Sequence, residues 1–118
     1  INTDACGKGS RIYGRTSNHI LELHWVLSDG NVARSHSISP ATLSEFKQQP
    51  GRLGKIYRQV DEIVTSKREA IAKTFPKMPR FMTGYNLAKV YQNDNFNLNW
   101  ILAGSEGTLA VITEAKLK

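Results

Sequence analysis

The sequence predicts an α+β fold, with a mainly antiparallel sheet flanked by helices. Two segments, 20–28 and 108–114, alternate apolar and polar residues with the period of a β-strand. The first of them runs into Asp29-Gly30, a turn that is typical of a hairpin. A third segment, 53–71, repeats apolar residues at helical spacing. A tight turn pairs neighbouring strands antiparallel, so these observations together indicate the fold class.

The composition is that of a single domain, 1–118, with a modest core. Of the 118 residues, 40% are hydrophobic and 22% are charged. No apolar run is long enough for a transmembrane segment, and the single cysteine, Cys6, cannot form a disulfide within the chain, which fits a reducing, cytoplasmic location. The net charge of +6 and the pI of about 9.7 would attract anions of any kind.

The first strand, 20–28, is expected to bury one face and to leave Glu22 and His24 on the other. The residues predicted to face the core are Leu21, Leu23, Trp25 and Leu27. After the turn, the chain should return as a strand over 31–38, and Pro40 should end it, because proline has no backbone N–H to donate.

The middle of the chain is predicted to be helical. One long amphipathic helix over 53–71 turns its charged residues to solvent, and Pro76 and Pro79 end it. Short helical turns are expected at 86–91 and 98–102, before the final strand.

Two glycine-rich loops lie at opposite ends of the sequence. The opening stretch, 2–19, combines glycines with Lys8, Arg11 and Arg15, and the closing stretch, 104–108, leads directly into a strand. Such backbone can approach a ligand closely and point its N–H groups at negative charge. The spacing matches neither a Walker loop nor a Rossmann fingerprint. On these residues alone, glycines that simply make surface turns are an equal alternative.

Other kinds of site are not indicated. The three histidines fall on different elements and lack the spacing of a metal site, and no Ser-His-Asp arrangement can be argued. We therefore predict no metal and no catalytic residue in this chain. The helix cations are interleaved with acidic residues and lack aromatic platforms, so nucleic-acid binding explains the charge poorly.

Read in order, several motifs resemble a known family. They are NTDA-x-G, YG-x-T, a strand running into DG, TGYNL, and GSEGTLAVITEAKLK. This order is similar to that of the FAD-linked oxidases and dehydrogenases of the vanillyl-alcohol oxidase and p-cresol methylhydroxylase superfamily, in the D-lactate, glycolate and D-2-hydroxyglutarate dehydrogenase branch. The resemblance implies that FAD lies between two α+β subdomains and that this chain is the second, the C-terminal half of the FAD-binding domain. Segment 39–79 would then be a helical insertion.

The resemblance also implies which residues contact the cofactor. In the opening loop they are Thr3, Asp4, Ala5, Gly7, Ser10, Tyr13 and Gly14. In the closing loop and the strand beyond they are Gly104, Ser105, Glu106, Gly107, Thr108 and Ile112. Many members have Asn and Gly where this chain has Asp4 and Cys6, so the contacts there stay open, and gap filling by Cys6 is favoured over flavin chemistry.

Two of these assignments have structural alternatives. Ordinary core packing is as good an account of Tyr13 as a cofactor contact. For TGYNL, residues 83–87, a helix start capped by Asn86 is favoured over a role near the substrate.

The function that the resemblance implies is FAD-dependent oxidation of a D-2-hydroxy acid such as D-lactate, glycolate or D-2-hydroxyglutarate. The chain would be an inactive piece of a longer polypeptide with a first FAD subdomain, a substrate domain and, in some relatives, an iron–sulfur module. The full-length protein would be cytoplasmic or peripheral to the inner membrane. The alternative is a non-enzymatic basic module that binds acidic partners or nucleic acid.

Overall fold

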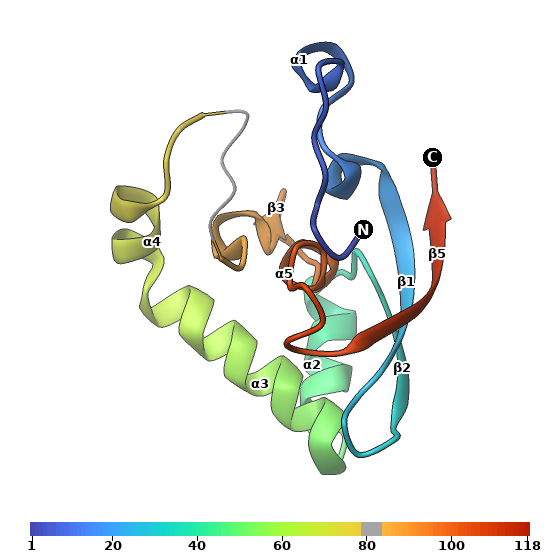
Figure 1. The fold of residues 1–118 in the computed structure, drawn as a ribbon. Helices are drawn as coiled ribbons and strands as arrows, with labels where there is room; N and C mark the ends of the chain where they lie inside the picture. Colours follow the sequence, from blue (N-terminus) through green and yellow to red (C-terminus); the bar gives the residue numbers. More distant parts are fainter. Residues whose placement is uncertain (79–83) are drawn as a thin grey trace.

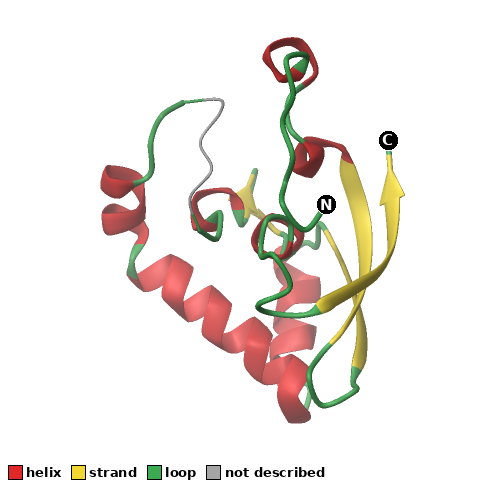
Figure 2. Ribbon diagram, in the orientation of Figure 1, coloured by secondary structure: helices red, strands yellow, loops and turns green. Residues whose placement is uncertain are grey.

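The computed structural model describes residues 1–78 and 84–118 and confirms the α+β class (Figures 1 and 2). One sheet has the strand order β2-β1-β5, and β1 pairs antiparallel with both neighbours. A short hairpin forms a second sheet. The strands are β1 (Ile20–Val26), β2 (Val32–His36), β3 (Tyr91–Gln92), β4 (Asn95–Phe96) and β5 (Val111–Leu117).

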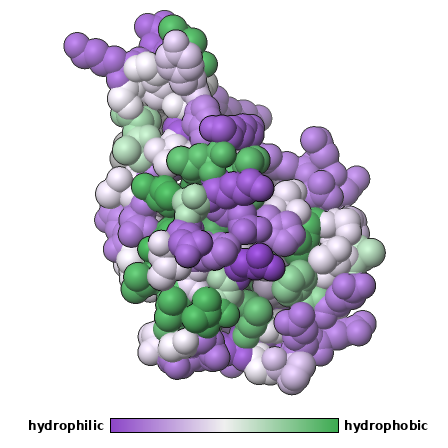
Figure 3. Space-filling model, turned by 90° about the vertical axis from the view of Figure 1, so that its right-hand side faces the viewer, coloured by the Kyte–Doolittle hydropathy of each residue, from purple (hydrophilic) through white to green (hydrophobic). Residues whose placement is uncertain are grey.

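The helices are α1 (Ser10–Tyr13), α2 (Pro40–Gln48), α3 (Gly51–Ser66), α4 (Arg68–Thr74) and α5 (Asn99–Leu102), with 3-10 turns η1 (Thr16–His19) and η2 (Leu87–Lys89). Helices α2, α3 and α5 lie on one side of the larger sheet (Figure 1). The opening segment, which carries α1, stands apart from the rest (Figures 1 and 3). In the described part of the chain, none of the helices has the length and apolar character that crossing a membrane requires.

Strand β1 confirms the predicted strand with one correction, at Leu21. This residue was expected in the core but is 40% exposed, and Ile20 is buried instead. Ile20 pairs with Leu117 and Glu22 pairs with Lys116, so Leu21 is an extra residue on β1. Such a β-bulge shifts by one position the alternation of side chains between the two faces of the sheet. A prediction based on a strict period of two cannot include this shift.

The predicted hairpin is confirmed. The Leu27 N–H donates to the Asn31 carbonyl at 2.9 Å, and the Gly30 N–H donates to the Leu27 carbonyl at 2.9 Å. Gly30 has a φ of 83°, which a glycine adopts without steric cost, as the last residue of a three-residue loop requires. Asp29 also pairs with Arg52 at 3.0 Å, so the turn is tied to the start of α3.

The core lies between the sheet and the helices. Its largest fully buried side chains are Trp25, Tyr57, Phe96, Leu23, Val90 and Ser35. The Trp25 Nε1 donates to the Ser35 hydroxyl at 3.0 Å, and that hydroxyl donates to the Asn99 side-chain oxygen at 2.6 Å. This chain of bonds satisfies the buried polar groups and joins β1, β2 and α5.

Segment 39–79 is helical as predicted where it is described, but the single long helix is wrong. Lys67 has φ −102° and ψ 16° and separates α3 from α4. The Ser66 hydroxyl and the Lys67 N–H both donate to the Ile63 carbonyl, at 3.5 and 3.0 Å. Such a bond from a side chain to the backbone competes with the hydrogen bonds of a regular helix. Helix α4 ends before Pro76, and Pro79 lies outside the described residues. That this segment is an insertion stays a prediction.

A separate helix at α2 was not predicted within the helical segment 39–79, although Ser39-Pro40 is a start signal: the Ser39 hydroxyl accepts the Thr42 N–H at 3.3 Å. It packs closely on α3. The rings of Phe46 and Tyr57 stack with centroids 4.7 Å apart. A Cβ on Gly54 would lie 1.9 Å from the Gln49 carbonyl oxygen, so only glycine permits this approach.

We therefore expect Gly54→Ala to lower the free energy of unfolding by about 1–3 kcal/mol, because the added methyl forces α2 and α3 apart. Urea denaturation checks this. Gly7→Ala is the matched control, since Gly7 has open space around it and should tolerate the methyl group. Equal stability of the two variants would contradict the close approach of α2 and α3.

Asp61 on α3 holds together three elements. Its carboxylate forms an ion pair with Lys47 on α2, accepts the Tyr91 hydroxyl from β3 and accepts the Thr65 hydroxyl at 3.2 Å. Burial raises the pKa of Asp61, but the bonds from Lys47 and Tyr91 outweigh burial and hold its pKa below the usual value. Burial and the Asp61 carboxylate together raise the pKa of Tyr91.

A lowered folded-state pKa means that Asp61 stabilises the fold above its unfolded-state pKa, about 3.9, and that this stability is lost as the pH falls through the folded-state value. We expect Asp61→Asn to be less stable than the parent at pH 7 and to lose less stability on acidification below about pH 4. Urea titrations at several pH values measure both effects. The control is Glu69→Gln, which changes an exposed acid on α4; its free energy of unfolding at pH 7 should stay within about 0.5 kcal/mol of that of the parent. Parallel curves of unfolding free energy against pH for Asp61→Asn and the parent would contradict the lowered pKa of Asp61.

Candidate functional site

The two glycine-rich loops, which lie near opposite ends of the sequence, are side by side in the structure. The Gly104 N–H donates to the Ile1 carbonyl at 3.2 Å, and the Glu106 N–H donates to the Asn2 carbonyl at 2.9 Å. These two bonds place Thr3 and Asp4 beside the closing loop. Segments about a hundred positions apart therefore share one surface.

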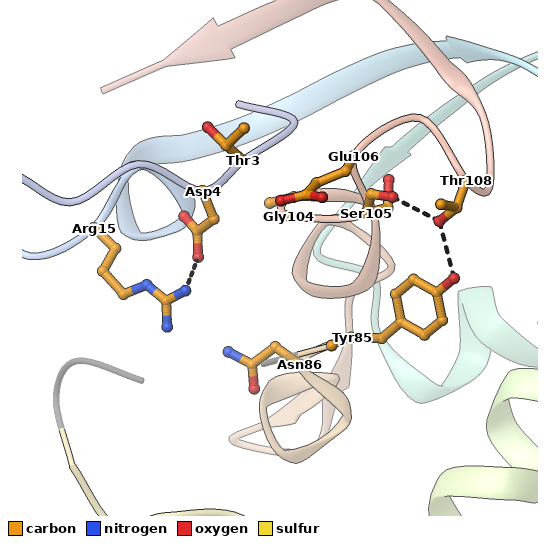
Figure 4. Close-up of a pocket in the computed structure, with 11 residues that line it drawn as sticks. Thr3, Asp4, Arg15, Tyr85, Asn86, Gly104, Ser105, Glu106 and Thr108 are labelled. Carbon is orange, nitrogen blue, oxygen red and sulfur yellow. Dashed lines mark hydrogen bonds and ion pairs between the residues drawn. The ribbon is translucent and has the colours of Figure 1, made fainter. Parts of the chain in front are cut away.

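A cavity of about 280 Å³ lies at this junction (Figure 4). Its walls come from three segments. The opening loop contributes Thr3, Asp4 and Arg15; the closing loop contributes 103–106 and Thr108; the segment before and into η2 contributes 84–86. Figure 4 shows the Asp4–Arg15 pair and the Tyr85–Thr108 pair on opposite sides of it.

The structure brings together part of the predicted cofactor set. The predicted residues that line the cavity are Thr3, Asp4, Gly104, Ser105, Glu106 and Thr108. Those that do not line it are Ala5, Gly7, Ser10, Tyr13, Gly14, Gly107 and Ile112. After Ala5 the chain leaves the cavity to form α1, and the Ile112 side chain packs against the core. The core-packing alternative for Tyr13 is wrong, because Tyr13 is 72% exposed.

Sequence reasoning missed Arg15 and Tyr85 as lining residues and gave Asn86 a different role. Asn86 does stand at the start of η2, but its side chain makes no capping bond. Its Oδ1 is buried without a hydrogen-bond partner among the described residues. Thr83, the first residue of TGYNL, lies outside those residues. Motif order could point to Tyr85 and Asn86, whereas no sequence signal singles out Arg15.

Asp4 organises the wall formed by the opening loop. Its carboxylate accepts the Ser17 N–H at 2.8 Å and the Ser17 hydroxyl at 3.0 Å, and it pairs with Arg15 at 2.7 Å. Asp4 is 3% exposed and has a φ of 45°, a left-handed conformation that aspartate tolerates better than most residues. Both carboxylate oxygens accept, whereas an asparagine has one acceptor oxygen, so aspartate suits this position.

The closing loop turns through several left-handed residues. Gly104, Glu106 and Gly107 have φ values of 81°, 52° and 79°. The Thr108 hydroxyl donates to the Ser105 carbonyl at 2.6 Å and lies 2.9 Å from the Tyr85 hydroxyl. Ser105 is 2% exposed, yet its hydroxyl has no hydrogen-bond partner in the described structure. Ser105 thus lines the cavity and carries a desolvated hydroxyl without a partner.

The charged groups that line the cavity do not favour an anion. Among the described lining residues, Asp4 and Glu106 are acidic and Arg15 is basic, and Arg15 is paired with Asp4. Lys8 and Arg11, the other cations of the opening loop, are exposed on the segment around α1 and do not line the cavity. The wall therefore suits hydroxyl and amide groups of a ligand better than phosphate groups.

The histidines lie away from the cavity. His24 contacts Glu22 at 2.8 Å and Glu114 at 3.3 Å on the sheet. Within residues 1–78 and 84–118, no group of three or more His, Cys, Asp and Glu side chains could hold a metal ion.

The chain is similar over almost its whole length to D-2-hydroxyglutarate dehydrogenases. It is 48% identical over 118 residues to that of Pseudomonas putida, 44% identical over 119 residues to that of Pantoea ananatis and 41% identical over 119 residues to that of Escherichia coli. Each alignment covers 99% of this chain and 12% of the relative. No family model and no solved structure matches the chain. The similarity supports the D-2-hydroxy acid dehydrogenase branch, and the chain spans about 12% of the length of these relatives.

The geometry of the closing loop predicts unequal costs for its two glycines. Both have positive φ, where a side chain costs about 1–2 kcal/mol. A Cβ on Gly104 would also approach the Asp4 Cβ to 3.3 Å, whereas a Cβ on Gly107 would meet nothing within 4 Å. Gly104→Ala should therefore lower the midpoint of thermal unfolding more than Gly107→Ala. The reverse order would show that Asp4 and Gly104 are not in contact.

Proposed function

We propose that this chain is the second FAD-binding subdomain of a longer flavoprotein that oxidises a D-2-hydroxy acid, with D-2-hydroxyglutarate the first substrate to test. The similarity to D-2-hydroxyglutarate dehydrogenases supports the substrate class. The order of motifs supports the superfamily, and the antiparallel sheet flanked by helices is compatible with it. The proposal includes a cytoplasmic location, with attachment at the periphery of the inner membrane as its variant.

The observation that carries the proposal is the meeting of the two loops. The motif resemblance assigns NTDA and GSEGT to the same cofactor, although a hundred residues separate them. Backbone hydrogen bonds from 104 and 106 to residues 1 and 2 bring them together around one cavity. A fold in which these glycines made unrelated surface turns would have no need of that contact.

The residues present fit part of an FAD molecule. The cavity of about 280 Å³ is slightly smaller than the pockets of about 300–1,000 Å³ that enclose a drug-sized ligand, so it would hold only a portion of the dinucleotide. Ser105 and Asn86 offer buried oxygens without partners, which a ligand's hydroxyl or amide groups would satisfy. The excess of acidic groups in the wall leaves the diphosphate to other parts of the longer protein.

The residues of this chain would bind and orient, and none would be catalytic. A bound flavin supplies the redox chemistry by accepting a hydride from the carbon that bears the substrate hydroxyl. The Asp4–Arg15 pair fixes the wall formed by the opening loop, and the Tyr85–Thr108 contact fixes the closing loop. Rigid walls lower the cost of ordering a ligand on binding.

Ser105→Ala tests this role, because it separates binding from folding. The variant removes a buried hydroxyl that has no partner, so the stability of the flavin-free protein should stay equal or rise. If the hydroxyl contacts FAD, the affinity of the full-length protein for FAD should fall about tenfold, as loss of about 1.4 kcal/mol implies. Flavin fluorescence titration of the deflavinated full-length protein measures it.

Ser35→Ala is the matched control. The Ser35 hydroxyl bonds to Trp25 and Asn99 in the core, so its loss should lower stability and leave FAD affinity unchanged. The 118-residue chain alone should bind FAD weakly, because half a cleft leaves most of the ligand in water. A full-length protein that purifies without flavin and binds none would overturn the proposal.

A further inference from the structure

A second, larger hollow lies along α3 and is apolar. Its volume is about 770 Å³. One wall is a stripe of α3, and the facing wall comes from β1, η2, α5 and the residues just before β5; we call this hollow the α3 groove. Ile63 on α3 is 48% exposed, and Leu109 on the facing side is 39% exposed. Exposed apolar surface in a continuous hollow marks a site of contact.

The groove is not the contact between α2 and α3. Helix α3 turns Gly54 and Tyr57 toward α2, and both are buried. Ile56, Val60 and Ile63 lie on a different face, at spacings of four and three residues, and line the groove. Thus α3 carries two apolar stripes. In the second stripe, Ile56 and Val60 are partly buried against the core, and Ile63 is left exposed.

The charge of the groove is uneven along its length. Arg52 and Lys55 line its end at the start of α3, where the helix has no acidic residue in its first turn. The positive end of the helix dipole adds to these two cations. Arg52 is paired with Asp29, while Lys55 is exposed at the rim. An occupant that matches the groove is therefore apolar along Ile56–Ile63 and acidic beside Lys55.

The length of the apolar stripe on α3 fits a helix as the occupant. The stripe from Arg52 to Ile63 runs for about 17 Å, at 1.5 Å per residue, which is about three turns of a partner helix. Groove binding of an amphipathic helix by anchors one turn apart is a recurrent mode of recognition. The relatives supply ample chain for it, because this sequence spans 12% of their length.

We propose that the α3 groove binds an amphipathic helix from outside residues 1–118 of the same polypeptide, with an Asp or Glu of that helix against Lys55. This inference goes beyond FAD binding and rests only on the part of the proposed function that makes the chain a segment of a longer protein. Tyr85 lines both the α3 groove and the cavity, so the helix packs next to the closing loop.

Zero-length carbodiimide coupling of the full-length protein tests the acidic contact. The expected product is an amide between the Lys55 Nζ and an Asp or Glu outside residues 1–118, identified by peptide mass spectrometry. Lys55→Arg keeps the charge but forms no such amide, so the product should vanish while the fold persists. A mixture of ¹⁴N and ¹⁵N subunits separates coupling within one chain from coupling between copies, and coupling only between copies overturns the proposal.

A second measurement reads the apolar contact. In full-length Ile63→Cys, maleimide should react at position 63 at least about tenfold more slowly in the native state than in urea. Adding Lys55→Glu should speed the native reaction by about threefold or more, because it repels the acidic end. Equal native and urea rates would overturn the proposal. So would protection that appears only when decanoate is added, because the groove would then bind a small amphiphile and not a helix of the same polypeptide. Neither readout involves the flavin, so failure here is distinguishable from failure of the proposed function.

Discussion

The hydrogen bonds from the closing loop to the first two residues are the constraint on which the candidate site depends. The Gly104 and Glu106 N–H groups reach the Ile1 and Asn2 carbonyls, and this alignment brings Asp4 next to Gly104. Asp4 then uses both carboxylate oxygens to fix Arg15 and Ser17. The ordering cost of two glycine-rich loops is large, and the buried bonds of Asp4 offset it without filling the cavity.

Two sets of side-chain contacts fix the elements that form the cavity and the α3 groove. The bonds from Trp25 to Ser35 and from Ser35 to Asn99 tie the sheet to α5, and α5 ends just before the closing loop. On the other side, the Asp61 cluster joins α3 to α2 and β3. Tyr85 lines both hollows, and its hydroxyl lies 2.9 Å from the Thr108 hydroxyl.

The distribution of charge revises a simple account of a basic protein. A net charge of +6 suggests that the glycine-rich loops attract phosphate. In the folded chain, Lys8 and Arg11 stand on the exposed segment around α1, and the described cavity wall carries Asp4, Glu106 and a single guanidinium. Net charge is a sum over the whole surface, whereas a ligand responds to the groups within a few ångströms of it.

What the sequence determined by itself is local. Local patterns, set by residues within a few positions of one another, predict four features: the strand at β1, the glycine turn after it, the helical middle and the glycine-rich loops. Tertiary structure decided the rest. The bulge at Leu21 exists because β5 pairs across it, and Arg15 lines the cavity because it pairs with the buried Asp4. The apolar stripe of Ile56, Val60 and Ile63 becomes one wall of a groove because the chain folds another wall opposite it. These features depend on contacts between residues that are distant in sequence, and such contacts stabilise the chain only when the whole domain is folded.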